Sequence, residues 1–126
     1  MNIDRLDHLV LTVQNIERTC AFYERALGMQ TVTFGAGRKA LQFGQQKINL
    51  HEAGKEFDPR ARRPTPGSGD LCFIASDPLA EVIAHLRACG VAIEEGPAQR
   101  AGALGLMQSI YLRDPDGNLI ELSNYL

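Results

Sequence analysis

Residues 8–28 read HLVLTVQNIERTCAFYERALG, and they overlay without a gap on residues 70–90, which read DLCFIASDPLAEVIAHLRACG. Each stretch opens with an apolar run typical of a strand and continues with apolar residues at helical spacing. Each ends on a glycine, Gly28 or Gly90, where a left-handed helix C-cap is expected. The chain therefore carries the same strand–helix unit twice.

Polar residues that favour a helix N-cap stand before each predicted helix, Gln14-Asn15 in the first copy and Ser76-Asp77 in the second. Three short strand-like runs separated by turn residues then follow each helix. The last turn, Asp114-Pro115-Asp116-Gly117, is a strong signal because proline and glycine suit its backbone angles. The predicted strands are residues 29–34, 39–43 and 47–51 in the first half, and 91–95, 107–112 and 118–123 in the second.

The pattern predicts an α+β fold of two tandem βαβββ modules that form an eight-stranded incomplete barrel or cleft. Module 1 covers about residues 1–54 and module 2 about residues 69–126, within a single domain of residues 1–126. The linker of about residues 55–68 is rich in Pro, Arg and Gly, which favours a surface connection, a lid or a dimer-clasping segment. One βαβββ unit has little core of its own, so the modules must pair within the chain or between chains.

Bulk composition excludes several classes of partner. The 126 residues are 44% hydrophobic and 22% charged with a net charge of −2, so neither nucleic acid nor a membrane surface is expected as partner. No apolar run approaches the roughly 20 residues that span a bilayer, and no signal-peptide pattern begins the chain. A cytoplasmic location is expected. The three cysteines are expected to be small buried residues.

The repeat also predicts which side chains line a cleft. His8 overlays Asp70, and Asn49 overlays Glu121, so four polar residues occupy equivalent places within apolar strands. His51 follows Asn49 by two residues and shares its strand face. A carboxylate inside a strand is costly unless it is paired, solvated in a cleft or bound to a metal. His8 and Glu121 together are candidates for a divalent metal site, because imidazole and carboxylate suit Fe(II), Mn, Ni or Zn.

Three segments resemble the vicinal oxygen chelate superfamily, which includes glyoxalases, bleomycin resistance proteins and extradiol dioxygenases. They are Asp7–Val13, Ala21–Gly28 and Arg113–Leu122, and the resemblance covers essentially the whole chain. The run Gln46–Gly54 is similar, more narrowly, to the small proteins grouped with glyoxalase domain-containing protein 5. A shared fold hosts many reactions, so the superfamily does not by itself name an activity.

The resemblance implies a metal ligand on the first strand, here His8, and a glutamate on the last strand, here Glu121. The chain departs from the family at two further positions, where Asp70 replaces a histidine and Asn49 replaces a glutamate found in glyoxalase I relatives. A third ligand is then either His51 or Asp70. The His51 set has two histidines and one carboxylate, typical of iron oxygen chemistry, whereas the Asp70 set favours Mn, Mg or Ni.

The resemblance implies a metal-dependent lyase, isomerase or dioxygenase acting on a small vicinally oxygenated compound, with a carboxylate such as Glu121 moving protons. Gln108 and Tyr111 are candidate substrate contacts. The alternative is a metal-free protein that sequesters a small molecule, as the bleomycin-resistance branch does, and a role in virulence or stress through interaction is a third possibility. A homodimer is expected by the same resemblance.

Overall fold

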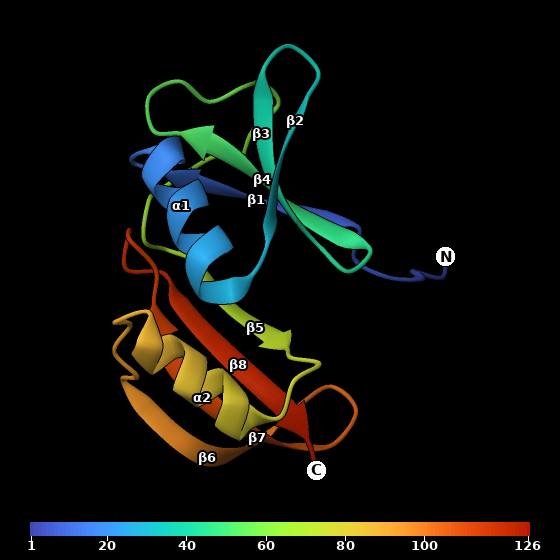
Figure 1. Cartoon of the computed structure of the whole chain (residues 1–126). Helices are drawn as coiled ribbons and strands as arrows, with labels where there is room; N and C mark the ends of the chain where they lie inside the picture. The colour runs from blue at the N-terminus through green and yellow to red at the C-terminus, as the bar shows by residue number, and fades with distance from the viewer. The chain divides into compact units, whose positions relative to one another are not determined.

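The structure, a computed structural model, describes all 126 residues and contains two helices and eight strands (Figure 1). The two halves have the same order of elements, strand, helix and three strands, so the predicted tandem βαβββ modules are confirmed. The first half comprises β1 (His8–Val13), α1 (Ile16–Leu27), β2 (Gln30–Phe34), β3 (Arg38–Phe43) and β4 (Gln46–Glu52). The second comprises β5 (Asp70–Ile74), α2 (Leu79–Ala88), β6 (Glu95–Ala101), β7 (Leu106–Arg113) and β8 (Leu119–Tyr125).

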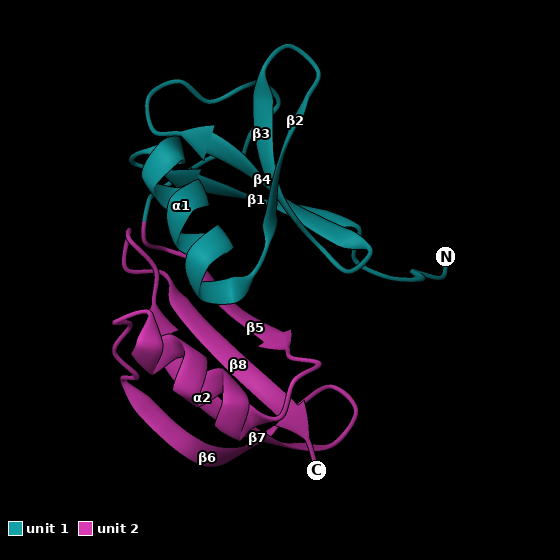
Figure 2. Ribbon diagram, viewed as in Figure 1, with its two compact units in different colours: residues 1–66 teal, residues 67–126 magenta.

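The chain divides into two compact units, Met1–Pro66 and Gly67–Leu126 (Figure 2). Unit 1 holds a four-stranded sheet of order β1-β4-β3-β2, and unit 2 holds one of order β5-β8-β7-β6. In each, the first and last strands of the module pair in parallel and the other neighbours pair antiparallel. The strands thus form two separate sheets rather than one closed barrel. Neither helix is long and apolar enough to cross a membrane.

The core of unit 1 lies between α1 and one face of its sheet. The buried apolar residues of the central strands alternate along the chain and share this face, as Ile48 and Leu50 do on β4. Asn15 caps α1 as predicted, since its Oδ1 accepts a hydrogen bond from the Arg18 backbone N–H at 2.9 Å. Gly28 ends the helix with a φ of 65°. The buried side chains of this core are Leu11, Val13, Tyr23, Leu41, Ile48 and Leu50.

Unit 2 has the equivalent core between α2 and its sheet, but its helix begins differently. The predicted caps Ser76-Asp77 are wrong, because α2 starts after Pro78, which has no side chain able to cap. The acceptor comes instead from Asn124 on β8, whose Oδ1 lies 2.7 Å from the Leu79 backbone nitrogen. Its Nδ2 donates to the carbonyls of Ala75 and Asp77 at 3.2 and 3.1 Å. A residue from the far end of the unit therefore fixes the start of this helix.

Strand β6 corrects a second prediction. The sequence suggested a strand over residues 91–95 with a break at Gly96-Pro97, whereas β6 runs from Glu95 to Ala101 through that dipeptide. It is an edge strand with a register shift between Glu95 and Ala98, so proline removes no ladder hydrogen bond that the sheet needs. A Cβ at Gly96 would lie 2.4 Å from the Ser109 carbonyl oxygen, so the close strand approach requires glycine.

Candidate functional site

Each sheet has one face covered by its own helix and one face opposite, here called the open face. Odd and even strand positions point to opposite faces, so the buried residues that contact the helices fix which positions belong to the open face. In unit 1 they include His8, Asn49 and His51, and in unit 2 they include Asp70 and Glu121. The polar residues predicted from the repeat therefore share the open face of their own sheet.

The strand register shows that Asn49 and Glu121 occupy the same position in the two units. Asn49 pairs with Val10 on β1 and with Ala40 on β3. Glu121 pairs with Cys72 on β5 and with Tyr111 on β7. The partners on the first strand of each module are equivalent as well, because Val10 lies two residues after His8 and Cys72 lies two residues after Asp70.

His8 begins β1 and carries a half-exposed imidazole. Its Nδ1 forms a hydrogen bond with Asp7 Oδ2 at 2.7 Å, and its side chain is 43% exposed. His8 faces Lys47 in the parallel ladder, whereas His51 faces Thr12. Lys47 and His51 are four residues apart, which is about 13 Å along a strand. His8 and His51 therefore lie on the same face but are too far apart to contact each other.

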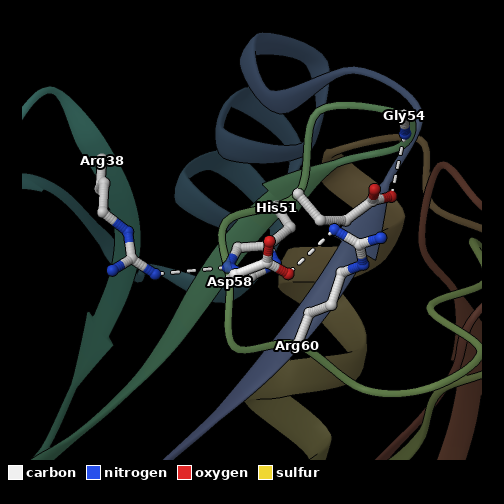
Figure 3. Close-up of polar contacts among 6 residues, drawn as sticks. Arg38, His51, Gly54, Asp58 and Arg60 are labelled. Atoms are coloured by element: carbon white, nitrogen blue, oxygen red, sulfur yellow. Dashed lines mark hydrogen bonds and ion pairs between the residues drawn. The ribbon is translucent and has the colours of Figure 1, made fainter.

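His51 lies instead beside Arg38 (Figure 3), in a cluster that also contains Phe34 and Phe57. Arg38 Nη2 lies 3.3 Å from His51 Nε2, and the His51 ring meets Phe57 edge-on with centroids 5.6 Å apart. The Arg38 guanidinium carbon is 4.6 Å from the Phe57 centroid and 5.2 Å from that of Phe34. Phe57 belongs to the predicted linker, so this segment covers part of the open face of unit 1. Neither Arg38 nor Phe57 was singled out from the sequence.

Burial and charge together set the state of His51. His51 is 2% exposed, and burial is the largest cause that lowers its pKa below the ordinary value. The positive charge of Arg38 is the second cause and acts in the same direction. His51 Nε2 accepts the Arg38 N–H, so the proton of the neutral ring lies on Nδ1. Neighbouring Asn49 is 6% exposed, and its Oδ1 has no hydrogen-bond partner.

The open face of unit 2 carries a chain of hydroxyl, thiol and carboxylate groups. Ser123 Oγ donates to Glu121 Oε2 at 3.3 Å and lies 2.7 Å from Ser109 Oγ and 3.4 Å from Cys72 Sγ. Lost hydration around the sulfur, and then the Glu121 carboxylate, raise the pKa of the Cys72 thiol, so it stays protonated at neutral pH. Cys72 is exposed, which contradicts the prediction that all three cysteines are buried.

The remaining predicted residues divide between the faces of unit 2. Asp70 begins β5, is exposed, and lies two positions from Glu121 on the open face. Tyr111 lies beside Glu121, and its hydroxyl accepts a hydrogen bond from Arg100 Nε at 3.0 Å. Gln108 pairs with Asn124 on the helix-covered face, so it does not share a surface with Tyr111. Within either unit, no group of three or more His, Cys, Asp or Glu side chains is arranged to hold a metal ion.

Comparison with known proteins places this geometry in a family. The chain matches the family model described as Glyoxalase/Bleomycin resistance protein/Dioxygenase superfamily over residues 5–122. It is 59% identical to virulence protein STM3117 of Salmonella typhimurium over 126 residues, which are 100% of this chain and 88% of that protein. It is 55% identical to glyoxalase domain-containing protein RDO1 of Mycosarcoma maydis, over 99% of this chain and 70% of that protein.

Solved structures agree with the sequence relatives. The crystal structure of STM3117 superposes with a TM-score of 0.99 over 100% of both chains. An integron cassette protein from the mobile metagenome of V. cholerae, VCH_CASS1, is 56% identical with a TM-score of 0.98, over 100% of this chain and 98% of that one. The chain therefore belongs to the glyoxalase/bleomycin resistance protein/dioxygenase superfamily.

Proposed function

We propose that this chain is a divalent-metal-dependent enzyme that acts on a small compound with oxygens on neighbouring carbons, and that His8 and Glu121 are metal ligands. The observation that carries the proposal is the hydrogen bond from His8 Nδ1 to Asp7. A carboxylate on one ring nitrogen orients a metal-binding histidine and raises the basicity of the other nitrogen. His8 Nε2 makes no hydrogen bond with the protein, so it is available as a ligand.

Glu121 suits the second ligand position. Its carboxylate accepts a hydrogen bond from Ser123 at 3.3 Å and also interacts with the Cys72 thiol and with the charge of Arg100. Imidazole and carboxylate together fit Fe, Mn, Ni or Zn. Members of the superfamily often use divalent metals, and the fosfomycin resistance protein FosX of Listeria monocytogenes, which shares the fold, was solved with Mn(II).

We assign the third position to Asp70 rather than His51. Asp70 lies on the same open face as Glu121, two strand positions away, and its exposed carboxylate is accessible. His51 Nε2 is already used by a guanidinium, whose positive charge opposes the approach of a cation. The expected set of His8, Asp70 and Glu121 is rich in oxygen and favours Mn, Mg or Ni.

The chemistry of the site follows from its residues. A bound divalent ion supplies a Lewis acid that stabilises negative charge on a substrate oxygen. The Glu121 oxygen that does not contact Ser123 is the one available to accept a substrate proton. Because the Tyr111 hydroxyl accepts from Arg100, its own hydrogen is free to be donated to a substrate oxygen.

Metal analysis of protein purified without chelator tests the proposal. We expect stoichiometric metal in the wild type, and its loss in His8→Ala and Glu121→Ala, while His85→Ala on α2 retains it as a histidine-matched control. Asp70→Asn is expected to weaken binding far more than His51→Ala. A wild-type protein that takes up no Fe, Mn, Mg, Ni, Co or Zn after incubation contradicts the enzyme proposal.

One observation favours a second candidate, a metal-free protein that binds and sequesters a small molecule. The Arg38–His51 cluster offers a positive charge and aromatic walls that need no metal to hold an oxygenated ligand. A protein that takes up no metal but still binds a small oxygenated ligand supports this second candidate function. We further propose a homodimer, for which light scattering with size-exclusion chromatography is the direct measurement.

A further inference from the structure

Two buried polar atoms on the open face of unit 1 lack hydrogen-bond partners, Nε of Arg38 and Oδ1 of Asn49. Asn49 pairs with Ala40 across the β3–β4 ladder, so Arg38 is its diagonal neighbour on the same face. Diagonal neighbours in antiparallel sheets lie about 7–8 Å apart between Cα atoms. One atom is a donor and the other an acceptor, so together they complement a small ligand that carries both functions.

The charge of Arg38 is also uncompensated. Its contacts are a neutral imidazole and two aromatic rings, and it forms no ion pair. Burial lowers the pKa of His51, and Arg38 lowers it further, so His51 brings no charge of its own. Lys47 adds a second cation, with Nζ 3.9 Å from the Phe34 ring centroid.

The nearby acids are engaged elsewhere. Glu56 accepts the Gly54 backbone N–H at 2.9 Å, and Asp58 pairs with Arg60 at 3.0 Å (Figure 3). Neither carboxylate pairs with Arg38, although Glu56 lies near enough to act on His51. The face therefore presents a planar cation between aromatic side chains, with an amide at the diagonal strand position and no carboxylate paired directly with the cation.

We propose that Arg38 and Asn49 recognise a small 2-hydroxy acid, a carboxylate with a hydroxyl on the adjacent carbon. The carboxylate accepts hydrogen bonds from the Arg38 guanidinium, which suits planar acids better than a lysine does. The hydroxyl donates to Asn49 Oδ1, and Phe34 and Phe57 contact the carbon skeleton. This inference rests on the proposed function and deepens it, since a 2-hydroxy acid is one class of vicinally oxygenated compound.

Three matched probes separate the two contacts. Mandelate carries the carboxylate, the hydroxyl and a ring for the aromatic walls, phenylacetate lacks the hydroxyl, and mandelamide lacks the charge. Each probe is titrated into chelator-treated protein, and binding is measured by calorimetry and by NMR chemical shifts. We expect mandelate to have a Kd about tenfold lower than either analogue. Equal binding of all three probes, or none, overturns the proposal.

Variants assign the contacts to residues. Arg38→Gln is expected to weaken mandelate about tenfold or more and to remove its advantage over mandelamide, while Asn49→Ala removes its advantage over phenylacetate. Lys39→Gln makes the same change in charge one residue away, where Nζ contacts Thr33, and is expected to leave the Kd unchanged. Arg38→Lys keeps the charge without the planar donor set and serves if Arg38→Gln does not fold. Equal losses in Lys39→Gln and in the Arg38 variants contradict the assignment.

The outcome is independent of the metal test. If the protein binds metal stoichiometrically but does not prefer mandelate over its two analogues, the hydroxy-acid site is refuted and the proposed enzyme function stands. Selective mandelate binding by a protein that takes up no metal refutes the enzyme and supports sequestration through Arg38 and Asn49.

Discussion

Asn124 of β8 holds the first turn of α2 through its amide oxygen, which accepts the Leu79 backbone N–H at 2.7 Å. The same amide also donates to the Ala75 and Asp77 carbonyls, so one side chain satisfies three backbone groups. Capping is usually local, whereas this cap joins residues 45 apart in the chain. The helix start and the last strand of unit 2 are therefore energetically coupled.

Asn124→Ala is expected to destabilise the protein by about 1–3 kcal/mol, because it leaves three backbone groups without partners. Urea unfolding followed by circular dichroism measures this free energy. Asn15→Ala removes the local cap of α1 and is expected to cost about 0.5–2 kcal/mol. A loss at Asn124 well below that at Asn15 would show that the long-range cap contributes little.

His51 is expected to make stability depend on pH in one direction. Burial and Arg38 hold its folded pKa below the ordinary value of about 6.5, so the unfolded chain takes up a proton before the folded chain does. The free energy of unfolding is then full above pH about 6.5 and falls as the pH drops through 6.5 towards the folded pKa. Urea unfolding between pH 7.5 and pH 5 measures the slope.

A difference between variants isolates this contribution. His51→Gln is expected to flatten the pH dependence below about 6.5, while His85→Gln on α2 retains it. The same slope in the wild type and in His51→Gln would mean that another group causes it.

Asp7→Asn is expected to weaken metal binding about 10–100-fold without removing it, because the residue orients His8 rather than contacting the ion. The hydrogen bond from His8 lowers the pKa of Asp7, so the carboxylate is ionised at neutral pH. Competition with a metal indicator gives the affinity. Asp4→Asn, which changes the same charge at a residue paired with Arg5, is the control. If both variants weaken metal binding equally, Asp7 acts only through its charge and does not orient His8.

Gly96→Ala is expected to disrupt the β6–β7 pairing, since its φ is 102° and a Cβ would lie 2.4 Å from the Ser109 carbonyl oxygen. Gly90 also has a positive φ, 73°, but has open space around it. Gly90→Ala should therefore cost only the backbone term of about 1–2 kcal/mol, and Gly96→Ala clearly more. Thermal unfolding of both variants tests this, and equal shifts would argue against the steric contribution.

Local patterns were sufficient to predict the fold, because the two modules repeat the same periodicity. The cap at Asn15 was predictable since the capping atom lies three residues from its donor. The cap at Asn124 was not, because it depends on which strand end meets which helix end. The extent of β6 was hidden for a similar reason: proline and glycine usually end strands, and the edge position that tolerates them is a property of the assembled sheet.

The candidate site was only partly predictable. Strand parity brought His8, Asn49 and His51 to one face, as expected from the alternation. Parity does not measure distance along a strand, so it did not show that His8 and His51 lie far apart. The partners of His51 were hidden as well, since Phe57 comes from a segment without periodicity and Arg38 stands at the start of a strand.

The shared register of Asn49 and Glu121 has an evolutionary consequence. A duplicated module keeps its backbone pairing whichever side chain stands at the central position, since neither side chain takes part in the ladder. Selection can then alter one copy towards holding a neutral amide and the other towards holding a charge, without altering either scaffold. The exchange Asn49→Glu places the residue of one copy at the same register position of the other.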